Sequence, residues 1–476
     1  MTAVNPLDLP EIWLHILNYL KGTDMVRCLC VCQVWHRMIL PRVWSNVIID
    51  INTIPTQPQG PSPDSLLHHC ELVKRLDINS EDLGIYNFIY PRLHTLSLGS
   101  GPLTGYKISY GGDPTSLVSL NRSLVHLHLH GFNGYLVAGF WRAVASLPLL
   151  KTLYLFRATM KNKDDIEAFW SMCTKLESIH IMASSIEACN SELTDLTFPK
   201  TRFLELRLLK SGRKMDPVDL ILRFPQLVGL KWYAFENQSL DKFARTIAQG
   251  RWPSLEKLSL NYNIADESMS PIIEGMRRIT SLDVSSNYLG PLTFQALQRH
   301  FSTLVELSLQ ECSGVESKMF QMIMCSCPRL ETLSGSAVRA VDVINGEPWT
   351  CLSLKTLQVC FEFYLEEQDL QHLIFERLAT LNQLEYLGIG KNGRNCRKFQ
   401  EALDLRLQSG LGALTKLKNI RQLNFCSTEQ ALHRSDILWM LSNWRRLQAV
   451  FGGLHQDRVI KDSLVSILRA HDVVTG

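Results

Sequence analysis

A six-residue pattern that returns at a nearly regular interval constrains the fold of this 476-residue chain more than any other feature. The pattern reads apolar-x-x-apolar-x-apolar, and its fifteen copies begin at residues 73, 93, 124, 150, 176, 203, 227, 255, 279, 304, 330, 354, 384, 420 and 447. The mean spacing of about 27 residues is typical of architectures that stack one supersecondary unit many times. The pattern therefore predicts a solenoid.

The composition of one repeat follows from the periodicity of its apolar residues. Within each copy, the last two apolar residues alternate with polar ones, as in a short strand with one buried face. The stretches between copies, for example 292–301 and 318–327, have apolar residues every three or four positions, which predicts helices. A Pro-x-Leu motif, for example Pro253-Ser254-Leu255, recurs where these helices are expected to end. Proline ends a helix because it lacks a backbone N–H and restricts the preceding residue. Each repeat is predicted to be strand, loop and helix.

These repeats resemble leucine-rich repeats over roughly residues 66–455. Residues 304–330 resemble the cysteine-containing subclass, with Cys312 after the strand and Cys327 before the next one. The family's asparagine position is kept as Asn263, Asn287 and Asn392 and is lost in many other copies. The resemblance implies an α/β fold, a curved leucine-rich-repeat horseshoe with parallel strands on the concave face and helices on the convex face.

The concave face is a candidate binding surface, because the side chains between the last two apolar residues of successive copies stack as neighbours. Read in this way, the row runs from Asp77 to Phe451 and has cationic and aromatic residues in its middle, a composition enriched in protein-binding hot spots. We predict that this middle binds a protein substrate, with a preference for an acidic or phosphorylated one. The predicted residues are Tyr154, Phe156, His180, Arg207, Lys231 and Tyr233. The alternative is an ordinary solvated sheet face.

The first fifty residues predict three short helices outside the repeats. Pro10 suits the first turn of a helix, and an apolar stripe follows it. Thr23 is a candidate N-cap for a second helix, and a third is expected to end near Leu40 because Pro41 follows. A domain this small is rarely stable without a partner. We therefore expect a helical domain at 1–50, a proline-rich linker at 51–65 and the repeat domain at 66–476, with a C-terminal cap.

The N-terminal segment resembles the F-box over residues 7–46. The matching positions, in the family's order and approximate spacing, are Leu9-Pro10-Glu11-Ile12, Ile16-Leu17, Leu20, Asp24, Val31-Cys32, Trp35 and Trp44. The resemblance implies docking on a Skp-type adaptor, which connects the chain to a cullin and a RING subunit. It also implies that the residues facing or supporting the adaptor are Leu9, Pro10, Ile12, Ile16, Leu17, Val31 and Trp35. The alternative is that these helices only cap the solenoid.

Motifs for chemistry are weak along the whole chain. The thiols of CLCVC at 28–32 cannot all face one metal from a helix, and we expect them to be buried in the small helical core. His126, His128 and His130 share one strand face but lie nearly 7 Å apart there, so a solvated or partner-contacting row is expected rather than a metal site. The loop at 99–105 lacks the ending of a phosphate-binding loop, and no catalytic motif occurs. We predict no catalytic residue, no metal and no cofactor.

Composition argues against several classes of partner. A net charge of +3, from 49 basic and 46 acidic residues, gives no global field to attract nucleic acid or an anionic membrane. No run of 18 apolar residues and no secretory signal is evident, so we expect an intracellular protein, cytoplasmic, nuclear or both. The thirteen cysteines are odd in number and are expected to be reduced.

Together the two resemblances imply the substrate-recognition subunit of a Skp-cullin-F-box ubiquitin ligase, which places a protein substrate without catalysing a reaction itself. The main alternative is a leucine-rich-repeat interaction scaffold that is not linked to ubiquitylation. An enzyme with an unrecognised site and an RNA-binding repeat protein are two further alternatives. The last would require a continuous basic stripe, and the predicted row has only Arg207 and Lys231 as permanent cations in its middle.

Overall fold

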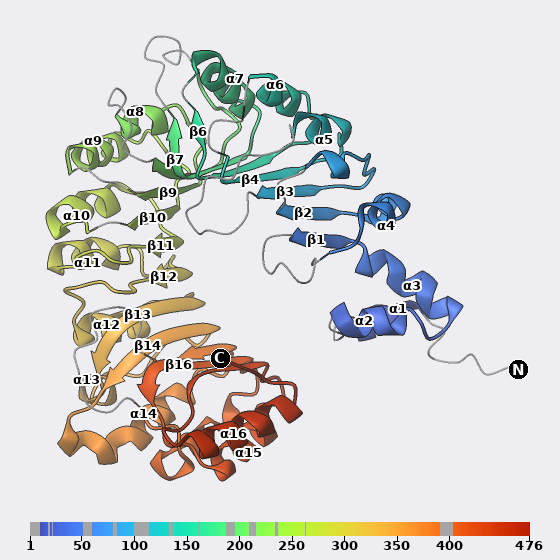
Figure 1. Ribbon diagram of the computed structural model, residues 1–476. Helices are drawn as coiled ribbons and strands as arrows, with labels where there is room; N and C mark the ends of the chain where they lie inside the picture. Colours follow the sequence, from blue (N-terminus) through green and yellow to red (C-terminus); the bar gives the residue numbers. More distant parts are fainter. Residues whose placement is uncertain are drawn as a thin grey trace, which may run out of the picture. The chain divides into compact units, whose positions relative to one another are not determined.

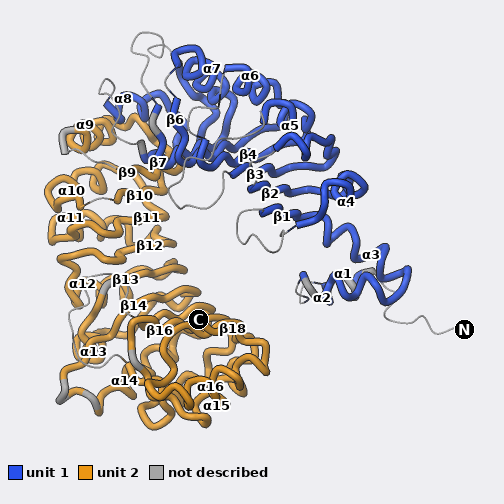
Figure 2. The backbone as a smooth tube through the Cα atoms, viewed as in Figure 1, with its two compact units in different colours: residues 1–227 blue, residues 228–476 orange. Residues whose placement is uncertain are grey.

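The structure is a computed structural model that forms two compact units, residues 1–227 and 228–476 (Figure 2). The residues that it describes are 10–17, 20, 22–50, 60–79, 83–99, 114–132, 136, 138–160, 162–186, 196–208, 216–233, 237–261, 263–390 and 403–476. Each unit is built from short parallel strands with helices packed along one side of the strand row (Figure 1).

The first unit contains a row of seven parallel strands, in which each strand pairs with the next. These strands are β1 (Asn46–Asp50), β2 (Arg75–Asn79), β3 (Thr95–Gly99), β4 (His126–His130), β5 (Thr152–Phe156), β7 (Ser178–Ile186) and β8 (Phe203–Leu208). A two-residue strand, β6 (Thr159–Met160), pairs with the end of β7. Side chains alternate between buried and partly exposed along the strands, as a sheet with one covered face requires.

In the first unit, α1 to α3 come before the strand row, and the later helices cover its buried face (Figure 1). They are α1 (Pro10–Leu17), α2 (Gly22–Cys28), α3 (Gln33–Val43), α4 (Pro63–His68), α5 (Thr115–Leu120), α6 (Ala138–Ala145), α7 (Lys163–Cys173), α8 (Pro217–Ile221) and two 3-10 turns, Cys70–Leu72 and Gly84–Tyr86. Large side chains such as Trp141 and Phe169 fill the space under the strands, with ring centroids 4.8 Å apart. Burial of these rings holds successive repeats together.

The second unit repeats the arrangement with ten parallel strands. They are β9 (Gly229–Tyr233), β10 (Lys257–Asn261), β11 (Ser281–Asp283), β12 (Glu306–Ser308), β13 (Thr332–Arg339), β14 (Thr356–Glu362), β15 (Tyr386–Gly388), β16 (Gln422–Glu429), β17 (Ala449–Gly453) and β18 (Val474–Thr475). The helices are α9 (Asn237–Ala248), α10 (Asp266–Gly275), α11 (Pro291–Gln298), α12 (Ser317–Ser326), α13 (Ala340–Ile344), α14 (Gln371–Leu378), α15 (Arg434–Asn443) and α16 (Arg458–Ala470), with 3-10 turns at Leu365–Leu370, Leu407–Ser409 and Leu411–Lys416.

The predicted fold class is confirmed. Each of the fifteen copies of the sequence pattern contains a strand, from β2 to β17, and helices or 3-10 turns separate most of these strands. The helix α6 packs into the core of its repeat through Phe140, Trp141 and Val144, which are buried. The chain is an α/β leucine-rich-repeat solenoid preceded by three short helices.

Three of the described strands lie outside the fifteen copies, namely β1, β18 and the two-residue β6. β1 pairs with β2 over five residues, although its sequence is also part of the predicted helical domain. Trp44, Val47 and Ile49 match the pattern, but the apolar Ile48 stands where the alternation requires a polar residue and hides the match. β18 pairs with β17 through only two residues, which is too short for a six-residue pattern to detect.

The position of Arg207 in the predicted row is wrong. The pairing of β7 with β8 aligns Ile179 with Leu204 and His180 with Glu205. Glu205 therefore occupies the row of His180, and Arg207 lies two residues further along the strand, level with Met182. The apolar residue Phe203, which is exposed, shifted the sequence alignment by two positions.

Two helix boundaries also differ from the prediction. α3 continues through Pro41 to Val43, because the N–H of Trp44 still reaches the carbonyl of Leu40 at 3.1 Å. Pro41 loses only its own hydrogen bond there, in the last turn of the helix, and its side chain is exposed. α2 begins at Gly22, so Thr23 lies inside the helix and not at its N-cap.

Candidate functional site

The three N-terminal helices pack around two buried side chains, Leu17 and Ile39. The apolar residues that pack against this pair are Ile16, Leu20, Met25, Cys28, Leu29, Trp35, Met38 and Val43. Ile16, Leu17 and Trp35 belong to the predicted adaptor-binding set. Their position in the cluster supports the fold of the helices, because each contributes area to a very small core.

Other members of the predicted set lie in different environments. Val31 is 59 % exposed, and Ile12 is half-buried. Leu9 lies outside the described residues, and of Pro10 only the helical backbone is described. Within the described part of the set, Val31 is thus the member best placed to contact another protein directly.

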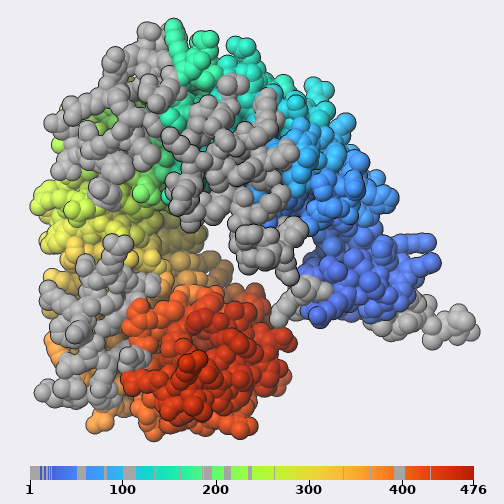
Figure 3. Space-filling view, in the orientation of Figure 1, coloured from blue at the N-terminus to red at the C-terminus, as the bar shows by residue number. Residues whose placement is uncertain are grey.

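Two exposed valines near Val31 were missed in the sequence analysis. Val26 on α2 and Val34 on α3 are each 51 % exposed, and they lie on either side of the turn that contains Val31. Figure 3 shows the N-terminal helices in dark blue as a separate lobe of the first unit. The sequence carries no signal for their exposure, because it depends on how α2 and α3 pack around Leu17 and Ile39. Exposed apolar side chains at Val26, Val31 and Val34 suit an apolar partner.

The expectation of buried thiols in the CLCVC segment is wrong for two of its three cysteines. Cys30 and Cys32 are exposed, and Cys28 is half-buried. Cys32 is the N-cap of α3, where its sulfur accepts a hydrogen bond from the N–H of Trp35 at 3.5 Å. This position explains the exposure, because an N-cap stands at the open end of its helix.

The three helices are joined directly to the strand row. α3 ends at Val43 and β1 begins at Asn46, and the carbonyl of Ser45 accepts hydrogen bonds of 2.9 Å from the N–H groups of Lys74 and Arg75. The ring of Trp44 lies 4.4 Å from that of His69. The predicted linker, 51–65, therefore lies between two paired strands, and the helices have a fixed attachment to the first repeat while their valines remain exposed.

On the strand face of the first unit, rings from three neighbouring strands stack into a ladder. The ring centroids of His128 and Tyr154 lie 5.6 Å apart, and those of Tyr154 and His180 lie 5.3 Å apart. His130 and Phe156 flank them, with centroids 6.1 Å apart. We call His128, His130, Tyr154, Phe156 and His180 the aromatic platform. Three of the predicted substrate-binding residues are brought together in it.

A carboxylate that the sequence analysis missed orients one end of the platform. Glu205 Oε2 lies 2.9 Å from His180 Nδ1, and Ser178 Oγ lies 2.9 Å from His180 Nε2. Both ring nitrogens are thus engaged at the ring edge. The buried pair Leu204 and Leu206 would have placed Glu205 on the open face, because alternate residues of a strand share a face.

The two histidines at the other end favour the neutral form. Burial lowers the pKa of His128 to about 4, and the nearby His130 and Arg75 act in the same direction. Burial also lowers the pKa of His130, which the carboxylate of Asp77 opposes. At neutral pH these imidazoles are therefore uncharged rings, not cations.

The remaining predicted substrate-binding residues do not join the platform. Arg207 is exposed on β8 beside it. Lys231 and Tyr233 belong to the second unit, where the Lys231 ammonium lies 5.7 Å from the centroid of the Tyr233 ring. The strand face next to them is polar, since Ser259 donates to Asp283 at 2.9 Å.

Comparison with known proteins identifies the N-terminal domain. The F-box-like family matches residues 8–50. An F-box/LRR-repeat protein of Arabidopsis thaliana is 23 % identical over 292 residues, which cover 57 % of this chain and 60 % of the relative. The chain thus carries an F-box-like segment ahead of its leucine-rich-repeat fold. The match spans less than two thirds of the relative's length, so the activity and partners of the chain are matters for proposal.

Two solved structures resemble this chain distantly. One is the crystal structure of the Rad7 and Elc1 complex in yeast, with a TM-score of 0.40 and 16 % identity, covering 82 % of this chain and 81 % of that chain. The other is an internalin from Listeria monocytogenes, with a TM-score of 0.32 and 12 % identity, covering 88 % of this chain and 89 % of that chain.

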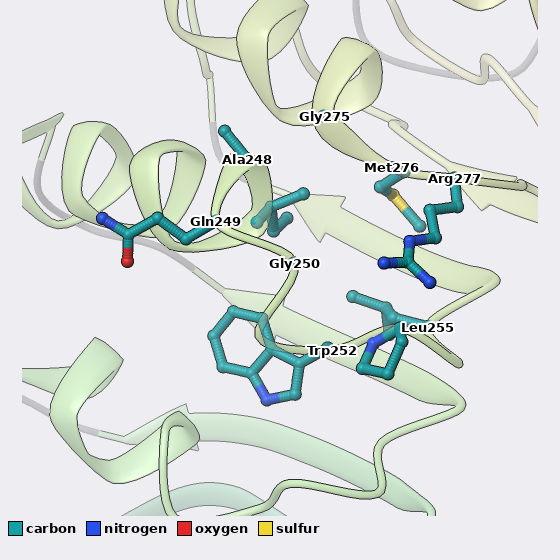
Figure 4. Close-up of a pocket in the computed structure, with 10 residues that line it drawn as sticks. Ala248, Gln249, Gly250, Trp252, Leu255, Gly275, Met276 and Arg277 are labelled. Atoms are coloured by element: carbon teal, nitrogen blue, oxygen red, sulfur yellow. The ribbon is translucent and has the colours of Figure 1, made fainter.

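A small cavity of about 320 Å³ lies in the second unit. It is formed where α9 and α10 end, around Gly250, Trp252 and Arg277 (Figure 4). Arg277 is the single charged side chain in its lining. Among the described residues, no group of three His, Cys, Asp or Glu side chains could hold a metal ion. No described helix is both long and apolar enough to span a bilayer.

Proposed function

We propose that this chain is the substrate-recognition subunit of a Skp-cullin-F-box ubiquitin ligase. The observation that carries the proposal is the F-box-like match over residues 8–50, in helices that leave Val26, Val31 and Val34 exposed. The members of F-box families generally bind Skp-type adaptors and act as non-catalytic receptors. The chain would thereby reach a cullin and a RING subunit in the cytoplasm, the nucleus or both.

The predicted adaptor-binding residues take two roles in this proposal. Val31 contacts the adaptor directly, together with Val26 and Val34. Ile16, Leu17 and Trp35 hold the helices in the shape that presents these valines, because they pack around Ile39. Leu9, Pro10 and Ile12 remain proposed adaptor contacts at the start of α1.

The strand face supplies the substrate-binding surface. Tyr154, Phe156 and His180 are partly exposed rings on the side of the sheet that the helices leave open. Aromatic side chains offer large contact area at low entropic cost, which suits protein recognition. Arg207, Lys231 and Tyr233 remain proposed contacts outside the platform.

The chain contributes placement and not bond chemistry. A substrate held in the same assembly as the ubiquitin donor meets it at a high effective concentration, in place of a dilute encounter. The expected consequence is ubiquitylation of the bound protein and its degradation.

Co-purification of the intact chain with a purified Skp-type adaptor, a cullin and a RING subunit tests this function. We expect the unaltered chain to retain all three. Val31→Glu combined with Val34→Glu should weaken adaptor binding by at least about tenfold, since charge enters the centre of an apolar contact. The matched control is Val459→Glu, at a valine that is 79 % exposed on α16 and distant in sequence.

The outcome decides between the proposal and its main alternative. A folded chain that retains no adaptor, or a double variant that binds it as well as the control does, would contradict the receptor assignment. In that case the repeats would serve an interaction scaffold without a link to ubiquitylation.

A further inference from the structure

The corrected strand alignment changes the charge of the surface that we propose for substrate binding. In the first unit, the row from β2 to β8 reads Asp77, Ser97, His128, Tyr154, His180 and Glu205. A carboxylate stands at each end, and no residue of this row is a lysine or arginine. Arg75 pairs with Asp77, His180 pairs with Glu205, and the exposed Arg207 lies beside the row on β8. The row itself offers an anionic substrate segment two carboxylates and no lysine or arginine, so it does not favour the acidic or phosphorylated partner expected from the sequence.

The rings between the carboxylates are suited to stacking. Neighbouring rings of the row are inclined by only 20° between His128 and Tyr154 and by 30° between Tyr154 and His180. The chain itself already places a guanidinium against the platform, since the Arg157 side chain lies 5.1 Å from the centroid of the Phe156 ring. The faces of such rings attract planar cations.

Asp77 supplies a hydrogen-bond acceptor beside these rings. Its Oδ2 pairs with Arg75 Nε at 3.0 Å. Its Oδ1 is buried and has no hydrogen-bond partner among the described residues. An unpaired buried acceptor costs free energy, which a donor from another molecule recovers when it displaces the side chains that cover Asp77.

Small residues on β3 leave room between Asp77 and the histidines of β4. Ser97 and Gly99 lie between the two strands in the register. A Cβ atom built on Gly99 would come only as near as 3.5 Å to Asn79 and 3.9 Å to His130. These are ordinary contact distances, so a flat group could approach the surface at this point.

We propose that the row from Asp77 to Glu205 binds a segment of the substrate protein through an arginine side chain, whose guanidinium stacks on the aromatic platform and donates to Asp77. This inference rests on the proposed function and names the chemistry of its substrate. Arginine fits better than lysine, because its guanidinium is planar, carries several donors in one plane and is less strongly hydrated. A substrate segment that is basic and aromatic is therefore recognised, and phosphorylation next to the arginine weakens binding.

Fluorescence anisotropy with the full chain bound to its adaptor tests this inference. The probes are three labelled peptides of equal length: alternating arginine and tyrosine, alternating lysine and tyrosine, and alternating phosphoserine and tyrosine. We expect the arginine peptide to bind about tenfold more tightly than the lysine peptide and the phosphoserine peptide not to bind.

Asp77→Asn and Tyr154→Ala should each weaken the binding of the arginine peptide by about tenfold. Their matched controls are Asp164→Asn, an exposed aspartate on α7, and Tyr288→Ala, an exposed tyrosine in the second unit. The controls should leave the affinity unchanged. Circular dichroism and adaptor retention show that each variant is folded.

Tighter binding of the phosphoserine peptide, or arginine-peptide binding that is equal in the variants and their controls, would overturn the inference. Adaptor retention is measured on the same samples. Loss of peptide specificity with the adaptor retained therefore rejects the substrate chemistry alone, and a folded chain without the adaptor rejects the ligase function.

Discussion

Asp266 illustrates how one polar side chain joins two repeats. It is 4 % exposed, and its carboxylate accepts hydrogen bonds from the backbone N–H groups of Gly290, Leu292 and Thr293 at 2.8 to 3.1 Å. These donors stand at the start of α11, where helical N–H groups lack partners within the helix. Burial raises the pKa of Asp266, but the hydrogen bonds from Thr293, Leu292 and Gly290 together lower it below its usual value.

We predict that Asp266→Ala destabilises the second unit by about 2 kcal/mol or more at pH 7, because it leaves the buried N–H groups of Gly290 and Thr293 and the part-buried one of Leu292 without their acceptor. The pKa of Asp266 is lower in the folded protein than in the unfolded chain. Its stabilising effect is therefore complete above its pKa in the unfolded chain and is lost as the pH falls through its pKa in the folded protein. Urea unfolding at neutral and acidic pH measures this. If the difference in free energy of unfolding between wild type and variant stayed constant down to the lowest pH, Asp266 would not stabilise the unit through its charged carboxylate.

At the scale of strands and loops, the sequence predicted most of the solenoid and lost accuracy where one apolar residue was misplaced. The fifteen patterns located β2 to β17, because buried leucines at period two are required wherever a strand covers a core. Phe203 and Ile48 are apolar yet exposed, and they led to the wrong row for Arg207 and to the omission of β1. Local sequence does not report which apolar residue faces solvent.

The candidate sites were predictable to a similar degree. Tyr154, Phe156 and His180 were found from the repeat phase alone, and the structure stacks them. Glu205 was missed because Phe203 shifted the sequence alignment of β8 by two residues. Val26 and Val34 could not be recognised as exposed, because their exposure depends on how α2 and α3 pack around Ile39.

Asn263 and Asn287 occupy the same position of the repeat pattern but differ in environment. Asn287 is 2 % exposed, donates to the carbonyls of Leu260 and Val284, and accepts from the N–H of Ile264 at 2.8 Å. Asn263 is exposed with a φ of 52°. Asn392 lies outside the described residues. The asparagine of the family is therefore a buried bridge between loops in one of the two described copies.

We predict that Asn287→Ala costs about 2–4 kcal/mol, because it removes three buried hydrogen bonds, and the two with Leu260 and Ile264 connect neighbouring repeats. The matched variant Asn263→Ala should cost at most about 1 kcal/mol, from the left-handed backbone conformation that alanine tolerates less well. Urea unfolding of both full-length variants provides the comparison. Equal losses at the two positions would show that the bridge at Asn287 does not stabilise the unit.

For the whole molecule, the attachment of the F-box to the repeats matters as much as either part. β1 belongs to the matched F-box-like region and also pairs with β2 in the strand row. Ile49 is buried in this contact, whereas its neighbour Ile48 points away and is exposed. A bound substrate and a bound adaptor would thus be held on one continuous strand row of the first unit.

We predict that Ile49→Asp separates β1 from β2 at a cost of about 3 kcal/mol or more, because it buries a charge without a partner. The helices around Leu17 and Ile39 should stay folded and should keep their adaptor affinity. Amide hydrogen exchange would detect faster exchange in 46–50 and unchanged protection in 33–43. Ile48→Asp is the matched control, and equal exchange in the two variants would mean that β1 does not depend on Ile49.

The central claim is that the exposed valines of the N-terminal helices bind a Skp-type adaptor. Amide hydrogen exchange of the full chain, with and without a saturating purified adaptor, tests it most directly. The account predicts new protection at residues 22–35, around Val26, Val31 and Val34, and little change in the strands of the second unit. A folded chain whose N-terminal helices exchange at the same rate with and without the adaptor would contradict it.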